Sequence, residues 1–438
     1  MPSLDYREAV HALYGLQCFG VKLGLEKISS LLACLGNPHH SFPACHIAGT
    51  NGKGTCAAVL DAILAAHGIQ SGLYTSPHLV SMRERIKTSG RTVPENYVTG
   101  WVSEHVDYIM RNRVTFFETI TAMAFDYFGH KKVGAAAVEV GLGGRYDATN
   151  VVYPRVGVIT SIGLEHTRYL GETITSVARE KAGIAKPGVP LLCGEKKRAA
   201  VKVIGEATRC AGGSLHLLDE VVSVSQLKIL PTGTRFNYRG PGLRLRGVSV
   251  PLYGVHNLRN VALGLWAAEL MLAELGLRLQ EDAFCHALKE LVWPARFQRL
   301  KVKDGPELVL DVAHNPPAAA KLNRLFQRIY PSQRALVVTA LAGDKDHAKF
   351  ILHLLKMADR FIFPHVDFGR AESGSGSRDP ENLKGLVKRY SPQAAAHVSP
   401  DMKDALEQAF RLAEGSPVVV TGSFHTVGEA MRILNIKA

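Results

Sequence analysis

The sequence lacks paired cysteines. Its seven cysteines, an odd number, are spread singly from Cys18 to Cys285, and no C-x-x-C pair occurs. Disulfide frameworks and structural zinc sites both depend on cysteines at short, repeated spacings. We therefore expect reduced thiols, with neither a disulfide framework nor a zinc site.

Long apolar runs are absent as well. No run reaches the roughly 20 apolar residues that a membrane-spanning helix needs. The first residues, MPSLDYREAVHAL, carry acids where a signal peptide would carry a basic segment and then an apolar one. These absences predict a cytoplasmic protein without a membrane partner.

The positive charge is not concentrated in any one segment. The chain has 52 Lys and Arg against 39 Asp and Glu, a formal net charge of +13 at pH 7. Nucleic-acid-binding surfaces cluster basic residues and interleave them with aromatic ones, and neither pattern occurs here. The net positive charge is the one feature that supports nucleic-acid binding, which stays an alternative. The dispersed pattern favours a protein that handles anionic small molecules, with no nucleic-acid partner.

The apolar pattern predicts two α/β domains. With 438 residues, 46% of them hydrophobic, the chain can build more than one core. From residue 45, short apolar runs such as "HIAG" and "VGVITSIG" alternate with helical stretches, as in a parallel sheet covered on both faces. Polar and apolar residues alternate between Ser223 and Leu252, which predicts a small antiparallel patch. A second alternating series follows "VWPARFQRL", so we predict a domain at 1–295 and a smaller, Rossmann-like α/β domain at 296–438.

The stretch "HIAGTNGKGTC" carries the clearest chemistry. It lies between a predicted strand and a helix expected from Cys56 to His67, where glycines let backbone N–H groups face an anion. Lys53 can place its charge on the β- and γ-phosphates of a nucleotide, and Thr55 can offer a hydroxyl to Mg²⁺. The spacing departs from G-x-x-x-x-G-K-[ST], because Ile47 replaces the first glycine and Gly54 precedes the threonine. The predicted nucleotide-binding residues are Gly49, Asn51, Gly52, Lys53, Gly54 and Thr55.

Eight further motifs follow this P-loop in order. They are "SPHL" (76–79), "EVGLGGRYDATN" (139–150), "TSIGLEHTRYLG" (160–171), "REKAGI" (179–184), "HNLRN" (256–260), "PARF" (294–297), "DVAHNP" (311–316) and "GSFHTVGE" (422–429). With the P-loop, they closely resemble the folylpolyglutamate synthase and dihydrofolate synthase family of the Mur ligase superfamily. The resemblance extends from "LGLEKI" at Leu23 to the end of the chain, and it implies that the first domain is an ATP-binding Mur-ligase-type domain.

The resemblance implies an ATP-dependent ligase that joins L-glutamate to a pteroate or folate carboxylate. The carboxylate oxygen is a poor leaving group, so ATP first converts the carboxylate to an acyl phosphate, which the glutamate amine then attacks. No enzyme nucleophile is needed, and the chain has no G-x-S-x-G elbow. The motifs are similar to those of bifunctional bacterial enzymes, which act on dihydropteroate and on reduced folates.

The resemblance also implies a metal set and a modified lysine. Ser76, Glu139 and His166, together with Thr55, would hold two Mg²⁺ ions, although histidine is a less typical ligand for that metal. Lys181 corresponds to a lysine that is carbamylated in relatives, which converts the cation into an oxygen-bearing anion able to approach the metal, so the resemblance implies a catalytic and metal-binding role for it. The alternative for Lys181 is a surface side chain that pairs with an acid such as Glu180.

Further positions are assigned by the same resemblance. Asn257, Arg296 and Asp311 would contact the nucleotide. His314 and Ser423 would act in glutamate binding or at the acyl-phosphate step, although a lone histidine is also compatible with a purely structural role.

The resemblance also implies a pterin pocket. Asp147 would contact the pterin, with Glu118 in the same neighbourhood. Phe117 is either a stacking platform there or a core residue. One departure from the family is Glu165, where an aspartate is usual before the histidine.

Three other functions stay open. One is a single-activity folylpolyglutamate synthase. Another is a Mur-type cell-wall ligase, which would carry a substrate domain before the P-loop, where this chain has only about 45 residues. The third is a P-loop switch, although the chain lacks the Asn-Lys dipeptide of a guanine-reading motif. We expect a monomer with small-molecule substrates.

Overall fold

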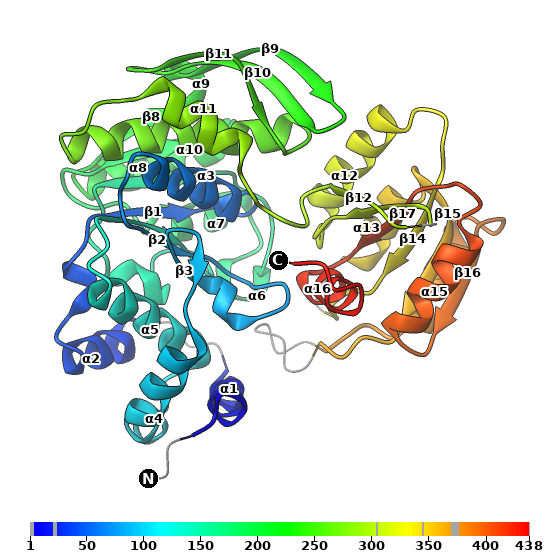
Figure 1. Cartoon of the computed structure of the whole chain (residues 1–438), viewed down its shortest axis with the longest axis horizontal. Coiled ribbons are helices and arrows are strands. Elements are labelled where there is room, and N and C mark those ends of the chain that lie inside the picture. Colours follow the sequence, from blue (N-terminus) through cyan, green and yellow to red (C-terminus); the bar gives the residue numbers. More distant parts are fainter. Residues whose placement is uncertain (1–3, 21–23, 304, 344–345, 369–375, 438) are drawn as a thin grey trace. The chain divides into compact units, whose positions relative to one another are not determined.

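The computed structural model describes residues 4–20, 24–303, 305–343, 346–368 and 376–437 (Figure 1). The chain divides into two compact units. The first comprises Met1–Pro77, Arg83–Pro251 and Val255–Val292, and the second comprises His78–Met82, Leu252–Gly254 and Trp293–Ala438.

The first unit contains an eight-stranded sheet in the order β4-β3-β2-β5-β1-β6-β7-β8. Its strands are β1 (Ala44–Ala48), β2 (Ser71–Tyr74), β3 (Ile86–Thr88), β4 (Arg91–Thr92), β5 (Ala135–Glu139), β6 (Val156–Ile159), β7 (Pro190–Cys193) and β8 (Ser214–Leu217). The strands from β2 to β8 in this order pair in parallel, and β3 and β4 add an antiparallel edge. Every residue of β1, β5 and β6 is buried, as a parallel sheet covered on both faces requires.

Helices connect these strands. They are α1 (Tyr6–Gly15), α2 (Glu26–Cys34), α3 (Lys53–Ala66), α4 (Glu95–Asn112), α5 (Phe116–His130), α6 (Thr167–Leu170), α7 (Ile174–Ala182), α8 (Arg198–Cys210), α9 (Leu218–Val221), α10 (Val255–Glu274) and α11 (Glu281–Lys289). Short 3₁₀ turns lie at η1 (Leu16–Phe19), η2 (Pro38–His40), η3 (Met82–Arg85) and η4 (Ala148–Val151). Helix α5 begins with a capping box, in which Thr115 and Glu118 each accept a backbone N–H of the other.

The predicted antiparallel patch is confirmed. Strands β9 (Ser223–Leu230), β10 (Gly233–Arg239) and β11 (Arg244–Val250) form a three-stranded sheet in the order β11-β10-β9. One face is held by a buried contact, because the Tyr238 hydroxyl donates to Glu269 of α10 at 2.5 Å.

The second unit is also an α/β fold. Its six-stranded sheet has the order β12-β13-β17-β14-β15-β16. The strands are β12 (Gln298–Lys301), β13 (Glu307–Leu310), β14 (Ala335–Thr339), β15 (Ala358–Pro364), β16 (Ala395–Ser399) and β17 (Val418–Thr421). The helices are α12 (Pro316–Ile329), α13 (His347–Leu354), α14 (Pro380–Tyr390), α15 (Met402–Leu412) and α16 (Phe424–Ile433). All pairs are parallel except the edge pair β12 and β13.

The fold agrees with the predicted class. All seven cysteines are free thiols. Among the residues described, the structure contains no helix that is both long enough and apolar enough to span a membrane.

Candidate active site

The P-loop joins the end of β1 to the start of α3. Helix α3 begins at Lys53, three residues earlier than the sequence predicted, because Gly52 adopts the left-handed conformation and serves as its N-cap. A Cβ at Gly52 would lie 2.2 Å from Nδ2 of Asn260, and a Cβ at Gly49 would lie 1.9 Å from Oγ1 of Thr160. Glycine is therefore required at both positions by close neighbours as well as by backbone conformation.

The residues that follow β6 hold the loop in place. The Thr50 N–H donates to the carbonyl of Ser161 at 2.7 Å. The carbonyl of Asn51 accepts from the hydroxyls of Thr160 and Ser161, both at 3.0 Å. Neither Thr160 nor Ser161 was predicted as a site residue, although both open the "TSIGLEHTRYLG" motif.

Lys53 lies beside a carboxylate from the neighbouring strand. Glu139 is the last residue of β5 and pairs in register with Ile47 of β1, which places it next to the P-loop. Lys53 Nζ lies 3.9 Å from Glu139 Oε1, and both side chains are largely shielded from solvent. The Ser76 N–H donates to Glu139 Oε2 at 3.1 Å. The structure thus brings together Lys53, Ser76 and Glu139.

The hydroxyl of Thr55 is available for a ligand. Thr55 is 1% exposed. Within the described part of the chain, its buried Oγ1 has no hydrogen-bond partner. A buried polar atom without a partner is costly unless a ligand satisfies it. Glu139 lies beside Lys53, which comes two positions before Thr55 in the P-loop. Oxygens of this kind suit Mg²⁺, which binds few protein oxygens and completes its shell with water and phosphate. A site of three or more His, Cys, Asp or Glu is not found among the residues described.

Lys181 is buried, so the surface alternative for this lysine is wrong. Its side chain, on α7, is 2% exposed and makes an ion pair with Glu165, with Nζ 2.8 Å from Oε1. Nζ also donates to the carbonyl of Gly49 in the P-loop at 3.0 Å. Burial lowers the pKa of Lys181 and Glu165 opposes that shift. Burial would raise the pKa of Glu165, but Lys181 and Lys53 outweigh burial and lower it.

His166 lies at the N-cap of α6 in the left-handed conformation, with φ of 45°. Its charge contributes to lowering the pKa of Glu165, which places it in the same electrostatic neighbourhood. Asn257 is buried in the first turn of α10.

Asp147 is the centre of a buried hydrogen-bond network. Its carboxylate accepts the N–H of Leu142 at 2.7 Å and the N–H and hydroxyl of Thr149. The Thr149 hydroxyl is also 2.8 Å from Nε2 of His46 on β1. Burial raises the pKa of Asp147 despite these donors. The network shapes the loop after β5, and neither Thr149 nor His46 was predicted from the sequence.

Phe117 packs against that same loop. A Cβ at Gly141 would lie 2.3 Å from the ring of Phe117, so glycine lets the ring approach the backbone. The ring centroid lies 6.2 Å from that of Tyr74. Since Gly141 is also a backbone donor to Asp147, the structure brings Phe117 and Asp147 together around one loop. Glu118 is buried in the capping box of α5.

Arg296 and Asp311 form a cluster in the second unit. The Asp311 carboxylate accepts the N–H groups of Phe297 and Ala313, both at 2.9 Å. Burial raises the pKa of Asp311 to about 6, against the opposing charge of Arg296. The Arg296 guanidinium lies 5.2 Å from the ring centroid of Phe424.

His314 and Ser423 lie near the same aromatic ring. The centroid of the His314 ring is 6.0 Å from that of Phe424, and its Nδ1 is 2.9 Å from the carbonyl of Val312. Ser423 is the N-cap of α16, where its hydroxyl accepts the N–H of Thr426 at 2.9 Å. Both side chains therefore have structural bonds in addition to any role in chemistry.

Comparison with known families gives a consistent assignment. The Mur ligase middle domain matches residues 47–268, and the glutamate ligase domain of Mur ligases matches residues 295–424. The dihydrofolate synthase/folylpolyglutamate synthase of Bacillus subtilis is 32% identical over 437 residues, which covers 98% of this chain and 99% of that protein. The chain belongs to the folylpolyglutamate synthase and dihydrofolate synthase family, within the Mur ligase superfamily.

Solved structures of the family agree with this fold. Mycobacterium tuberculosis folylpolyglutamate synthase complexed with ADP superposes with a TM-score of 0.88 at 29% identity, covering 98% of this chain and 99% of that one. Escherichia coli FolC in complex with DHPP and ADP superposes with a TM-score of 0.84 at 29% sequence identity, and the match covers 99% of each chain. As a family member, the protein is an ATP-dependent ligase.

One relative is much longer than this chain. The probable bifunctional folylpolyglutamate synthase/dihydropteroate synthase of Haloferax volcanii is 33% identical, but the match spans 98% of this chain and only 50% of that protein. Membership of the folylpolyglutamate synthase and dihydrofolate synthase family therefore says nothing about a dihydropteroate synthase activity here.

Proposed function

We propose that this protein adds L-glutamate both to dihydropteroate and to reduced folates, each time through an acyl phosphate. The observation that carries the proposal is the P-loop cluster of Lys53, Thr55 and Glu139. It occurs in a chain that aligns along nearly its whole length with a relative named for both activities.

The P-loop residues neutralise charge during phosphoryl transfer. Lys53 interacts with the β- and γ-phosphates of ATP, while the backbone N–H groups of Gly49, Asn51, Gly52 and Gly54 surround the phosphate chain. No bond to the enzyme forms, so the contribution of these residues is positioning and electrostatic stabilisation.

The metal-binding residues in this proposal are Thr55, Ser76, Glu139 and His166. Bound Mg²⁺ supplies charge neutralisation on the transferred phosphoryl group. Glu139 is held ready for this role because the Ser76 N–H already orients one carboxylate oxygen. The unpartnered Thr55 oxygen supplies a second protein ligand.

The substrate-binding residues are assigned by the same proposal. Asn257, Arg296 and Asp311 contact the nucleotide, and His314 and Ser423 act at the glutamate or the acyl phosphate. Phe117 stacks on the pterin. Asp147 contacts the pterin or, through its bonds to Leu142 and Thr149, holds the loop that does.

We propose that Lys181 is carbamylated in the working enzyme. Carbamylation starts from the neutral amine, which adds to CO₂ and releases a proton, and burial favours the neutral form. The ion pair with Glu165 opposes it. Replacing Glu165 with Gln is therefore expected to increase the carbamate signal in ¹³C NMR of protein equilibrated with ¹³CO₂, and Lys181→Arg is expected to abolish it. An unchanged signal in both variants would remove Lys181 from this role.

We also propose the domain roles, the oligomeric state and the cellular compartment of the enzyme. In this proposal the first unit, which ends at Val292, is the ATP-binding domain, and the second unit, whose main segment begins at Trp293, is the Rossmann-like domain. The enzyme acts as a cytoplasmic monomer on small molecules, without a nucleic-acid or membrane partner.

The decisive test is ADP release by the purified protein with ATP, Mg²⁺ and L-glutamate, supplied with either dihydropteroate or tetrahydrofolate. Products are identified by mass. Amide product from both acceptors is the expected result. Product from tetrahydrofolate alone would assign a single-activity folylpolyglutamate synthase. No product from either, with nucleotide bound, would exclude the proposal.

A further inference from the structure

A pocket in the first unit lies outside the site described above. It has a volume of about 730 Å³ and is bounded by α2 and η2 on one side, by α4 on the other, and by the C-terminal turns of α5. It is lined by Cys34, Leu35, Pro38, Ser41, Asn96, Tyr97, Gly100, Trp101, Glu104, His105, Asp126, Gly129 and His130. None of these residues belongs to the P-loop cluster or to the network around Asp147.

A carboxylate in this pocket is held by two fixed donors. Asp126 Oδ2 accepts the Tyr97 hydroxyl at 2.7 Å and the Trp101 indole N–H at 3.1 Å. Trp101 is 5% exposed, so its indole cannot turn away to water. Burial, followed by the hydrogen bond to Asp126, raises the pKa of the Tyr97 phenol, so Tyr97 remains the donor and Asp126 the acceptor.

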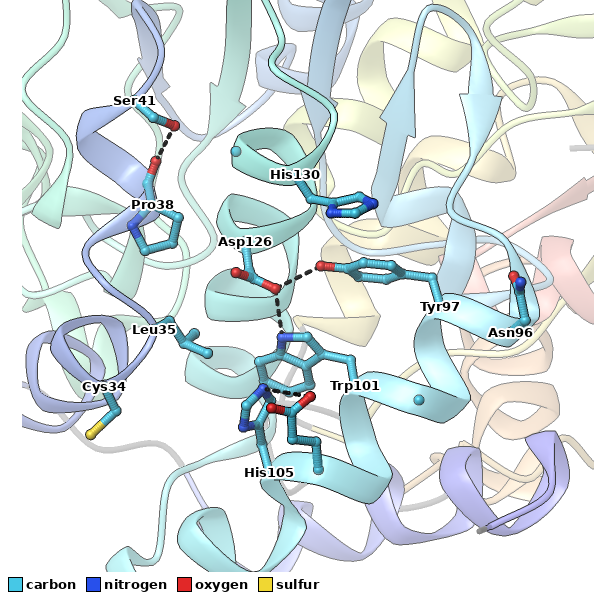
Figure 2. A pocket seen from close by; sticks show the side chains of 13 residues that line it. Cys34, Leu35, Pro38, Ser41, Asn96, Tyr97, Trp101, His105, Asp126 and His130 are labelled. Carbon is cyan, nitrogen blue, oxygen red and sulfur yellow. Dashed lines mark hydrogen bonds and ion pairs between the residues drawn. The ribbon is translucent and has the colours of Figure 1, made fainter.

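The second oxygen of the same carboxylate is available. Among the residues described, no donor contacts Asp126 Oδ1. Figure 2 shows this oxygen on the side of the carboxylate that faces Leu35 and Pro38, across the pocket from Tyr97. The pocket therefore presents a rigid, unused acceptor beside an apolar wall.

The fixed charge of the lining favours cations. Two of the thirteen lining residues described are carboxylates, Asp126 and Glu104, two are histidines, His105 and His130, and none is Lys or Arg. This is unusual in a chain with a formal net charge of +13. Glutamate, folates and nucleotides all carry carboxylates or phosphates, which the two acids would repel, so the substrates of the proposed reaction do not fit here.

We propose that this pocket binds an aliphatic diamine. One ammonium donates to Asp126 Oδ1 and the methylene chain lies against Leu35 and Pro38. The second ammonium pairs with Glu104, whose Oε2 lies 4.0 Å from Nε2 of His105, so the ammonium shares this carboxylate with the imidazole. An ammonium near Trp101 and Tyr97 also gains from the negative faces of their rings. The site is separate from the proposed ligase chemistry and does not depend on it.

The test follows the indole N–H of Trp101, which reports directly on the Asp126 carboxylate. The chain has three tryptophans, so the ¹H–¹⁵N spectrum has three indole signals, and Trp101→Phe identifies the relevant one. The full-length protein is titrated with 1,4-diaminobutane at low ionic strength, where charge pairing is strongest. Hexanedioate, a dianion of similar length, is titrated in parallel. We expect a saturable shift of the Trp101 signal with the diamine, and no such shift with the dianion.

Variants separate the site from general charge effects. Asp126→Asn is expected to weaken diamine binding at least tenfold by equilibrium dialysis. Glu104→Gln, at an exposed position that does not endanger folding, is expected to weaken it several-fold. Asp107→Asn removes an equal charge from α4 outside the pocket and should leave affinity unchanged. Absence of saturation up to about 10 mM diamine, or equal affinity in Glu104→Gln and Asp107→Asn, would overturn the proposal.

Discussion

At the residue scale, Lys53 of the P-loop lies beside the carboxylate of Glu139. Lys53 and Glu139 are close enough to attract each other, yet their 3.9 Å separation leaves the ammonium free to reorient toward phosphates. We expect this pair to contribute little net free energy to folding, because its separation is long for an ion pair and the cost of desolvating the two charges offsets their attraction.

Lys53→Ala is therefore expected to reduce the rate of ADP release by about 10³-fold or more, since it removes a preorganised charge from the transferred phosphoryl group. The unfolding temperature should change little. Lys202→Ala, an exposed lysine on α8, is the matched control and should keep wild-type turnover. Normal ADP release by the Lys53 variant would contradict the phosphate assignment.

The buried histidine on β1 predicts a pH dependence of stability. Burial, and then the charge of Lys186, lowers the pKa of His46 to about 3, whereas an unfolded histidine has a pKa near 6.5. Between these values the unfolded chain binds a proton that the folded chain does not. The free energy of unfolding therefore falls as the pH drops below 6.5, by up to about 1.4 kcal/mol per pH unit from this residue.

Other buried groups change the free energy of unfolding with pH in the opposite direction. The test therefore compares the wild type with a variant that lacks His46. Burial raises the pKa of Asp61 and that of Asp311 to about 6 each, which favours the folded state as the pH falls through 6. Urea unfolding from pH 7 to pH 5 is measured for the wild type and for His46→Gln. The wild type should lose more stability over this range than the variant. Parallel pH profiles would show that His46 is not the titrating group.

At the scale of elements, the contact between α3 and α10 determines how the P-loop helix sits on its unit. A Cβ at Gly264 of α10 would lie 2.8 Å from the Cβ and Cγ1 of Val59 and 2.9 Å from the carbonyl of Cys56. The two helices approach closely because Gly264 has no side chain at this point.

Gly264→Ala is expected to destabilise the protein by about 1–3 kcal/mol, because overpacking outweighs the better helix propensity of alanine. Gly100→Ala on α4 is the control, since nothing lies within 4 Å of its Cβ. That variant should be neutral or more stable by up to about 1 kcal/mol. Both are measured by urea unfolding. Equal stability of the two variants would show that α10 can shift without cost.

At the scale of the whole molecule, the seven thiols are distributed by burial and not by pairing. Cys18, Cys34 and Cys210 are exposed, and Cys285 is intermediate. The three others, Cys45, Cys56 and Cys193, are buried, and burial raises the pKa of each thiol. Raised pKa and lack of access both suppress reaction with a thiol reagent.

A thiol titration of the native protein is therefore expected to show three fast-reacting groups, a slower fourth, and three that react only after unfolding. The total should reach seven without a reducing agent. Peptide mass analysis assigns each phase. Fewer than seven thiols in the unfolded protein would contradict the absence of disulfides.

The sequence by itself determined the fold class and the chemistry of the P-loop. Parallel strands that are buried on both faces need near-continuous apolar runs. Strands with one solvent-exposed face alternate polar and apolar residues. Both patterns can be recognised in the sequence without a structure. A glycine-rich loop with one lysine before a helix predicts a phosphate-binding site, because its backbone N–H groups and the helix N-terminus can face an anion.

Only the tertiary structure decided which side chains share a site. Lys181 pairs with Glu165 and reaches the P-loop carbonyl of Gly49, although 132 positions separate Lys181 from Gly49. Thr160 and Ser161 support the P-loop because β6 lies beside β1. Asp126 meets Tyr97 and Trp101 because α4 and α5 pack together. Such contacts depend on strand order and helix packing, which bring distant residues together and leave no periodic signal in the sequence.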